Sequence, residues 1–257
     1  MNLTFATVIL ESFLLVFVRV AGFAAVAPLF GHKSIYPRLR VFIALCISLC
    51  IYPVVEIALP EYNTVLDYSI IFIKEILVGI SIGFVSKIIM EIINMAGELI
   101  DREIGFTMAT NFDPSTGGMV TISAELYDKL VYVVVVITNL HFFILRAIAR
   151  SFEAVPVGIV QIKEATMYST IISILGEYFA IGFRIAMPIF LGACILNVIL
   201  GILTKSSPQM NMFSIGMQLK VIMGLFVLTI AILYVPNIAN MLMEKVRSVL
   251  DSYLGGL

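Results

Sequence analysis

The chain has 257 residues, of which 61% are hydrophobic and only 13% are charged. Soluble domains carry roughly 25% charged residues, so this composition excludes an ordinary soluble domain and indicates an integral membrane protein. The formal net charge of -1 offers no electrostatic basis for binding nucleic acid.

Six apolar stretches follow one another along the chain, each long enough to cross a hydrocarbon core that needs ~20 residues. They cover roughly 3–27, 38 to between 53 and 60, 68–95, 123–148, 168–203 and 212–235. The pattern predicts an all-α membrane protein of about six long, partly bent or broken helices. The fifth stretch would be about 54 Å long, against a core of ~30 Å. Either it breaks at Gly182 or Pro188, or these helices do not simply span lipid; the sequence leaves both open.

Several charges lie within or beside the apolar stretches, where each costs ~2.5–3.5 kcal/mol at a helix centre. Glu11 and Arg19 are two helical turns apart and share a face. Lys87 and Glu91 have i,i+4 spacing, which permits pairing along one helix. A polar pathway and charge neutralisation within a bundle both fit, and the position of these charges near segment ends favours neutralisation.

Two further patterns concern packing. Gly79 and Gly83 form a GxxxG motif in the third stretch, which predicts close helix–helix contact. The tail 237–257 alternates polar and apolar residues at helical spacing, which predicts an amphipathic helix. That helix could lie on a membrane interface, against a partner or on its own protein.

The connector 96–118 differs from both a membrane span and an ordinary polar loop. It begins with a charged shoulder, which holds Glu98, Asp101 and Arg102, and continues with small, aromatic and thioether residues. Asp113-Pro114 predicts a local turn, and Gly117-Gly118 leaves the backbone free to move. The connector is therefore apolar enough to pack and too broken to remain helical throughout.

No catalytic constellation, cofactor motif or metal-ligand spacing is present in the sequence. His32 and His141, the only two histidines, are far apart, and neither has ligating neighbours at metal-site spacing. An intramembrane aspartyl protease would need paired acids on facing helices, whereas Asp101 and Asp113 lie in the connector. We therefore expect a protein that is not an enzyme. A secondary transporter of small solutes remains the alternative, with the region 182–188 as its only indication.

Four segments together resemble the FliR family of flagellar export-gate proteins, which has relatives in virulence-type secretion systems. They are PRLRVFIALCISL at 37–49, the third stretch with Glu75, Gly79 and Gly83, AGELID…GFTMATNFDP at 96–114, and KSSPQMNMFSIGMQLKVIMGL at 205–225. The resemblance covers essentially the whole chain.

The resemblance implies a subunit that assembles with FliP and FliQ into a closed helical channel for unfolded flagellar substrates, with FlhB at the cytoplasmic entrance. It implies a FliP-like part (1–165), a FliQ-like helical hairpin (166–236) and the amphipathic tail (237–257). The expected location is the bacterial inner membrane, within the flagellar basal body and in contact with lipid. Basic residues after the first and fifth stretches favour an N-terminus on the outer side. Use in a virulence-type system stays open.

By position, the resemblance identifies 106–122 as a plug segment that fills the lumen of the closed gate. Flexible thioether and aromatic side chains there can repack around a varied polypeptide. The plug residues are Phe106, Thr107, Met108, Phe112, Asp113, Pro114, Gly117, Gly118 and Met119. The resemblance also identifies 204–211 as the cytoplasmic tip of the FliQ-like hairpin, with Lys205, Pro208, Gln209 and Asn211.

Overall fold

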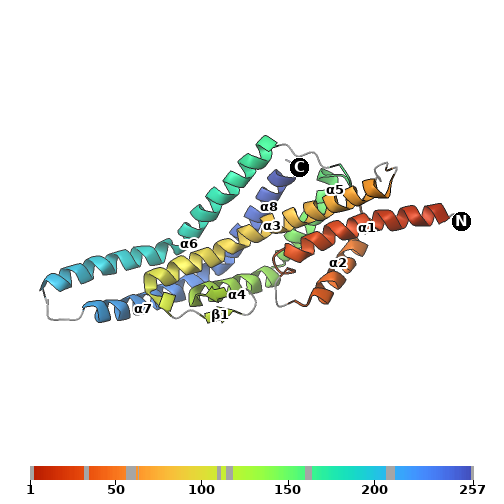
Figure 1. The fold of residues 1–257 in the computed structure, drawn as a ribbon. Helices are drawn as coiled ribbons and strands as arrows, with labels where there is room; N and C mark the ends of the chain where they lie inside the picture. Colours follow the sequence, from red (N-terminus) through yellow and green to blue (C-terminus); the bar gives the residue numbers. More distant parts are fainter. Residues whose placement is uncertain are drawn as a thin grey trace. The chain divides into compact units, whose positions relative to one another are not determined.

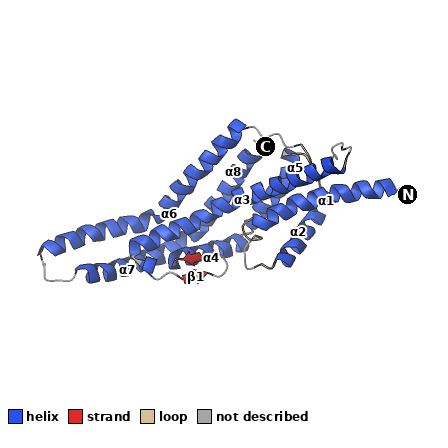
Figure 2. Ribbon diagram, viewed as in Figure 1, coloured by secondary structure: helices blue, strands red, loops and turns tan. Residues whose placement is uncertain are grey.

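The computed structural model describes residues 3–31, 35–55, 62, 64–108, 111–113, 118–159, 164–206 and 212–255. Figure 1 and Figure 2 show that helices dominate this part of the chain. Its α-helices are α1 (Leu3–Val26), α2 (Pro37–Ile51), α3 (Val65–Ile104), α4 (Ile122–Ile137), α5 (His141–Ala154), α6 (Glu164–Ser206), α7 (Met212–Ala231) and α8 (Val235–Leu254). Among the described residues the only strands are β1 (Asn111–Asp113) and β2 (Gly118–Val120), so the protein is an all-α membrane protein.

Apolar helices of membrane-spanning length support this class directly. Four helical segments are long and apolar enough to cross a bilayer: Thr7–Val26, Val65–Ile104, Tyr168–Ser206 and Ile215–Leu254. The pair α4 and α5 would add a fifth if both belong to one broken span. Two short 3-10 helices, η1 (Phe106–Met108) and η2 (Ile232–Tyr234), complete the described elements.

Two expected element boundaries need correction, and the structure decides a third that the sequence left open. The third apolar stretch, expected to end near residue 95, continues as α3 to Ile104, because its charged residues extend the helix. The fourth stretch, expected over 123–148, is two helices, because Asn139 adopts a φ of 58°, which a right-handed helix cannot contain. Helix α6 runs through Gly182 and Pro188 without interruption, so its length is not divided at either residue.

Helices α3 and α6 are longer than a bilayer core is thick. With 40 and 43 residues, they measure about 60 and 65 Å at 1.5 Å per residue. Even a helix of about 60 Å tilted by ~40° rises more than the ~30 Å of a hydrocarbon core. If α3 or α6 crosses a bilayer, part of it therefore lies outside the core.

The chain divides into two compact units that share its long helices. Unit 1 consists of residues 1–90, 139–175 and 243–257, and unit 2 consists of residues 91–138 and 176–242. In unit 1, α2 packs on α1, and the ring of Phe13 on α1 meets Tyr52, just after α2, edge-on at 5.7 Å between centroids. Helices α1 and α3 also contact each other, and their buried apolar residues include Leu15, Val16, Val20, Phe23, Val78 and Ile82.

Glycines allow the backbones of α1 and α3 to touch. A Cβ at Gly79 would collide with the carbonyl of Arg19, and one at Gly83 would lie 2.8 Å from the carbonyl oxygen of Phe23. From the other side, a Cβ at Gly22 would lie 2.8 Å from the carbonyl oxygen of Ile76. Real Cβ atoms do not approach backbone this closely, so only glycine fits at this crossing.

Unit 2 is assembled around the C-terminal part of α3. Gly97 lies directly against Ala124 of α4, with no room for a Cβ between them. Met95 covers Gly182 of α6, and Ile104 covers Gly224 of α7. Helices α6 and α7 also contact each other, where Met223 lies over Gly192. The last turns of α3 are thus held by α4, α6 and α7.

Candidate functional site

The connector between α3 and α4, which belongs to unit 2, combines a left-handed glycine, a 3-10 turn and two short strands. After Ile104 the helix ends at Gly105, whose φ of 94° is left-handed and whose N–H donates to the carbonyl oxygen of Asp101 at 2.9 Å. A residue in this conformation is a common way to terminate a helix, and glycine adopts it without steric cost. The 3-10 turn η1 follows immediately.

The middle of the connector forms a small antiparallel hairpin. Strands β1 and β2 pair Asn111 with Val120, Phe112 with Met119, and Asp113 with Gly118. The sequence pattern predicts an irregular loop with a turn here and gives no sign of strands. Three-residue strands are too short to produce a detectable alternation of polar and apolar residues.

A buried carboxylate fastens the base of the connector. Asp101 on α3 is fully buried and accepts hydrogen bonds from both the backbone N–H of Ser123, at 2.7 Å, and the Ser123 hydroxyl. Ser123 lies in the first turn of α4, where backbone N–H groups have no partner within the helix. Thr121 precedes α4 but makes no side-chain capping bond. Asp101 therefore supplies from α3 the cap and the negative charge that the N-terminus of α4 favours.

The structure divides the charged shoulder into two kinds of residue. Asp101 is buried and bonded to α4, whereas Glu98 and Arg102 are exposed on α3. The sequence grouped all three because they are close in the chain. Only the fold distinguishes the carboxylate that holds the connector from the charges that face outward.

The predicted plug residues are described to different extents. Phe106 is partly buried and Thr107 is exposed. Met108, Phe112, Asp113, Gly118 and Met119 are described by their backbone alone, which places Phe112 opposite Met119 and Asp113 opposite Gly118. Pro114 and Gly117 lie outside the described residues.

The hairpin tip predicted at 204–211 is described only at its start. Lys205 is exposed in the last turn of α6, which ends at Ser206. Pro208, Gln209 and Asn211 lie outside the described residues, and α7 begins at Met212.

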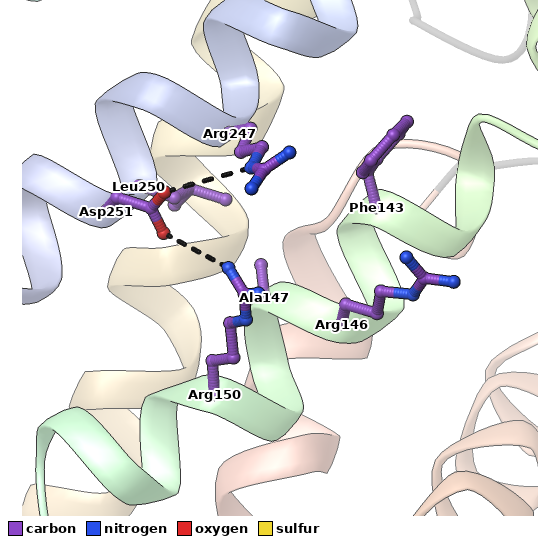
Figure 3. Close-up of a pocket in the computed structure, with 7 residues that line it drawn as sticks. All are labelled: Phe143, Arg146, Ala147, Arg150, Arg247, Leu250 and Asp251. Carbon is purple, nitrogen blue, oxygen red and sulfur yellow. Dashed lines mark ion pairs between the residues drawn. The ribbon is translucent and has the colours of Figure 1, made fainter.

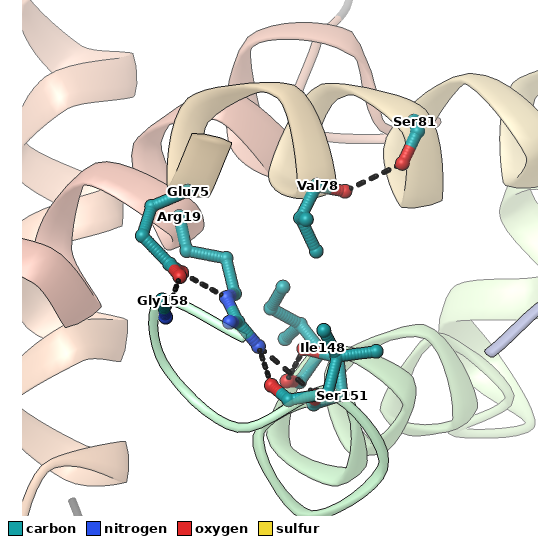
Figure 4. A network of polar contacts seen from close by, with 8 residues as sticks. Arg19, Glu75, Val78, Ser81, Ile148, Ser151 and Gly158 are labelled. Atoms are coloured by element: carbon teal, nitrogen blue, oxygen red, sulfur yellow. Dashed lines mark hydrogen bonds and ion pairs between the residues drawn. The ribbon is translucent and has the colours of Figure 1, made fainter. Parts of the chain in front are cut away.

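A buried ionic network in unit 1 is the feature that sequence reasoning missed (Figure 4). Arg19 on α1 and Glu75 on α3 are both fully buried, and Arg19 Nε donates to Glu75 Oε2 at 2.5 Å. Arg19 Nη1 donates to the carbonyl oxygens of Ser151 and Val155, each at 2.9 Å. The backbone N–H of Gly158 donates to Glu75 Oε1 at 2.9 Å.

This network joins three parts of unit 1 through two side chains. The Arg19 guanidinium also lies over the ring of Phe152, with its carbon 4.3 Å from the ring centroid. Charged groups in an apolar interior require such pairing, because an unpaired buried charge is strongly destabilising. Arg19 and Glu75 therefore link α1 and α3 to the end of α5 and the turn that follows it.

Glu11, which shares a helical face with Arg19, has a different partner. Its carboxylate accepts a hydrogen bond from the Tyr62 hydroxyl at 2.5 Å, and its carbonyl oxygen accepts one from the Tyr68 hydroxyl at 3.2 Å. The bond to Glu11 raises the pKa of the Tyr62 phenol, and desolvation adds to the effect.

The Arg19–Glu75 network has one signal in the sequence. A basic residue, Arg19, lies in one apolar stretch, and an acidic residue, Glu75, lies in another.

The described residues do not bring together three His, Cys, Asp or Glu side chains that could hold a metal ion. Both sites have a structural role. The Arg19–Glu75 network holds three segments of unit 1 together, and the Asp101–Ser123 contact holds the two ends of the connector together.

Comparison with known proteins identifies the family of this chain. The family model "Bacterial export proteins, family 1" matches residues 10–246. The chain belongs to this family. Among curated relatives, the flagellar biosynthetic protein FliR of Bacillus subtilis (strain 168) is 25% identical over 245 residues, covering 93% of this chain and 94% of the relative.

Other members of the family are similar at comparable levels. FliR of Aquifex aeolicus (strain VF5) is 29% identical, covering 87% of this chain and 86% of the relative. FliR of Escherichia coli (strain K12) is 26% identical, covering 80% of this chain and 78% of the relative. The match includes both the α3–α4 connector and the Arg19–Glu75 network, because both lie within residues 10–246.

Proposed function

We propose that this chain is the FliR subunit of a flagellar protein export gate and that it is not an enzyme. The observation that carries the proposal is the family match over residues 10–246, together with relatives named as flagellar biosynthetic proteins. In this role the chain assembles with FliP and FliQ, meets FlhB at the cytoplasmic entrance and passes unfolded substrates.

The exposed surface of α6 and α7 supports assembly with other hydrophobic subunits. Large apolar side chains on these helices are exposed in the isolated chain, among them Phe179, Phe183, Phe190, Ile195, Ile222 and Phe226. Surfaces of this kind require lipid or protein to cover them. We assign α6 and α7 to the FliQ-like hairpin of 166–236 and the preceding elements to the FliP-like part of 1–165.

Co-purification tests the assembly. Expressed with FliP and FliQ from the same genome, a tagged version of this chain should bring both down in a detergent-stable complex; expressed alone, it should be less stable. A chain that is stable alone and recovers neither protein would contradict the assignment.

We further propose that the plug segment 106–122 closes the gate. Its hairpin is attached at a base where Asp101 bonds Ser123 and Gly97 abuts Ala124. The fixed ends restrict where the connector can lie. In this proposal the short hairpin in its middle moves as a unit. Energy for export would come from other components, since the proposal gives this chain no catalytic residue.

Ion leakage through the assembled gate tests the plug. Replacing residues 107–119 with a Gly-Ser linker of equal length should raise conductance in planar bilayers or membrane vesicles. The matched control is Glu98→Gln with Arg102→Gln, which changes two exposed residues beside the segment. Conductance equal to that of the unaltered gate, in a complex of normal composition, would refute the plug assignment and leave family membership untouched.

The proposed location is the bacterial inner membrane, within the flagellar basal body, with the N-terminus on the outer side. Single cysteines placed in a variant lacking Cys46, Cys50 and Cys194 would test this orientation. A cysteine replacing Lys205 should react only with membrane-permeant reagents in intact cells. Labelling by an impermeant reagent would reverse the orientation.

A further inference from the structure

A basic pocket lies between two helices of unit 1, apart from the connector and the Arg19–Glu75 network (Figure 3). Four residues on one face of α5 and three on one face of α8 line it. They are Phe143, Arg146, Ala147, Arg150, Arg247, Leu250 and Asp251. The spacing of i, i+3, i+4 and i+7 on α5, and of i, i+3 and i+4 on α8, directs each set to a single side of its helix.

The pocket holds more positive than negative charge. Its three guanidinium groups face one carboxylate, so two positive charges remain uncompensated among the lining residues. Arg150 Nη1 and Arg247 Nε each lie 4.0 Å from an oxygen of Asp251, which is longer than a hydrogen bond. Figure 3 shows the Arg146 side chain directed away from Asp251 and Arg150.

The arginines are also accessible to a ligand. The side chains of Arg150 and Arg247 are 54% and 56% exposed, and Asp251 is 53% exposed. Their helices are amphipathic: Ile144 and Ile148 of α5 and Val246 of α8 are buried, whereas the arginines are exposed. The packing that holds the two helices therefore does not depend on the arginines, which are not required to neutralise a buried acid.

We propose that this pocket binds a phosphate group, presented either by the headgroup of an anionic phospholipid or by free phosphate. The planar guanidinium forms paired hydrogen bonds to phosphate oxygens, which makes arginine well suited to this ligand. Basic pockets between the helices of membrane proteins bind phospholipid headgroups in this way. Phe143 and Leu250 add an apolar wall beside the charges.

Native mass spectrometry of the delipidated full chain in detergent tests the proposal, with dioleoylphosphatidylglycerol, dioleoylphosphatidylcholine and inorganic phosphate as separate probes. Phosphatidylglycerol should bind more tightly than phosphatidylcholine. The double variant Arg150→Gln, Arg247→Gln should weaken phosphatidylglycerol binding by roughly 30-fold, since each basic residue contributes ~1 kcal/mol. The control Arg38→Gln, which removes an exposed arginine outside the pocket, should bind as the unaltered chain does.

A second variant keeps the test decisive if the double variant does not fold. Asp251→Asn removes the competing carboxylate and should strengthen phosphatidylglycerol binding by roughly 5-fold. A purely structural role for the arginines predicts no such gain. If inorganic phosphate competes at micromolar concentration, free phosphate is the source; if it does not compete, the lipid headgroup is. Unchanged binding in both Asp251→Asn and the double variant would overturn the proposal.

Discussion

The helices of this protein are similarly apolar but unequally covered by their own chain. The most apolar parts of the segments Thr7–Val26 and Val65–Ile104 have a mean hydropathy of 2.1 and are 50% and 56% buried. The segments Tyr168–Ser206 and Ile215–Leu254 reach 2.4 and 2.3, yet only 17% of each corresponding part is buried. Hydropathy therefore identifies apolar helices, but it does not indicate which of them are buried against the rest of the chain.

Backbone-to-backbone contact at glycines and a buried ion pair distinguish the contact between α1 and α3. Where α1 meets α3, Gly22, Gly79 and Gly83 bring backbones into contact, and the Arg19–Glu75 pair is fully enclosed. Helices α6 and α7 instead carry large exposed side chains such as Phe190 and Phe226. About half of the most apolar part of α1 and of α3 is therefore covered within the chain, whereas most of α6 and α7 is not.

Breaking the buried ion pair should produce the largest loss of stability. Arg19→Met or Glu75→Leu leaves one buried charge without its partner, which costs about 3–5 kcal/mol. Thermal unfolding in detergent, followed by size-exclusion chromatography, should show both single variants strongly destabilised. The double variant should recover much of the loss, because two apolar side chains leave no buried charge. A double variant as unstable as the sum of the two would show that the ionic link is not the dominant interaction.

Two glycine-to-alanine substitutions should have the next largest effects on stability, and the effects should differ between the two groups of helices. Gly79→Ala places a methyl group on the carbonyl of Arg19 and should cost about 1–3 kcal/mol through forced separation of α1 and α3. Gly201→Ala on α6 meets nothing within 4 Å. Its higher helix propensity should raise stability by up to about 1 kcal/mol. Equal melting temperatures for the two variants would contradict the close α1–α3 contact.

Removing the cap of α4 should have a smaller effect. Asp101→Ala deprives the Ser123 N–H of its acceptor and should cost about 0.5–2 kcal/mol. Limited proteolysis should also cleave the connector 105–121 faster in this variant. The matched control is Glu98→Ala, one turn earlier on the same helix and exposed. Indistinguishable cleavage rates for the two variants would argue against Asp101 as an anchor.

The smallest change in the stability of the chain alone is expected for exposed side chains on α6 and α7. Phe226 is 67% exposed, so Phe226→Ala should change the free energy of unfolding by no more than about 0.5 kcal/mol. The same substitution at fully buried Phe23 should cost about 3–5 kcal/mol. Under the proposed function, Phe226→Ala should weaken recovery of FliP and FliQ despite its normal stability. Strong destabilisation of the chain alone would show that α7 is covered within it.

The sequence predicted most of the fold, because runs of apolar residues have few structural solutions. Pro28 and Pro37 flank the connection between α1 and α2, as expected of residues that interrupt a helix or begin one. The C-terminal amphipathic pattern corresponds to α8, in which Leu242 and Val246 are buried while Glu244 and Arg247 are exposed. The interruption at Asn139 was missed, because asparagine among apolar residues is a weak breaker signal.

The sites were less predictable than the helices. Glu98, Asp101 and Arg102 are neighbours in the sequence with similar chemistry, and only the position of Ser123, 22 residues after Asp101, makes one of them a cap. The paired strands at 111–113 and 118–120 likewise depend on the connector ends being held together. Neither relationship leaves a periodic signal along the chain.

The sequence by itself determined that the chain is an all-α membrane protein with a non-helical connector after the third apolar stretch. These properties follow from composition and local periodicity, since each residue contributes to them through its nearest neighbours. Tertiary structure decided that Arg19 pairs with Glu75 rather than with Glu11, and that α1 and α3 are buried to a greater extent than α6 and α7. The physical reason is that a buried charge takes whichever partner the packed backbones bring within reach, and that distance is set between helices, not along one.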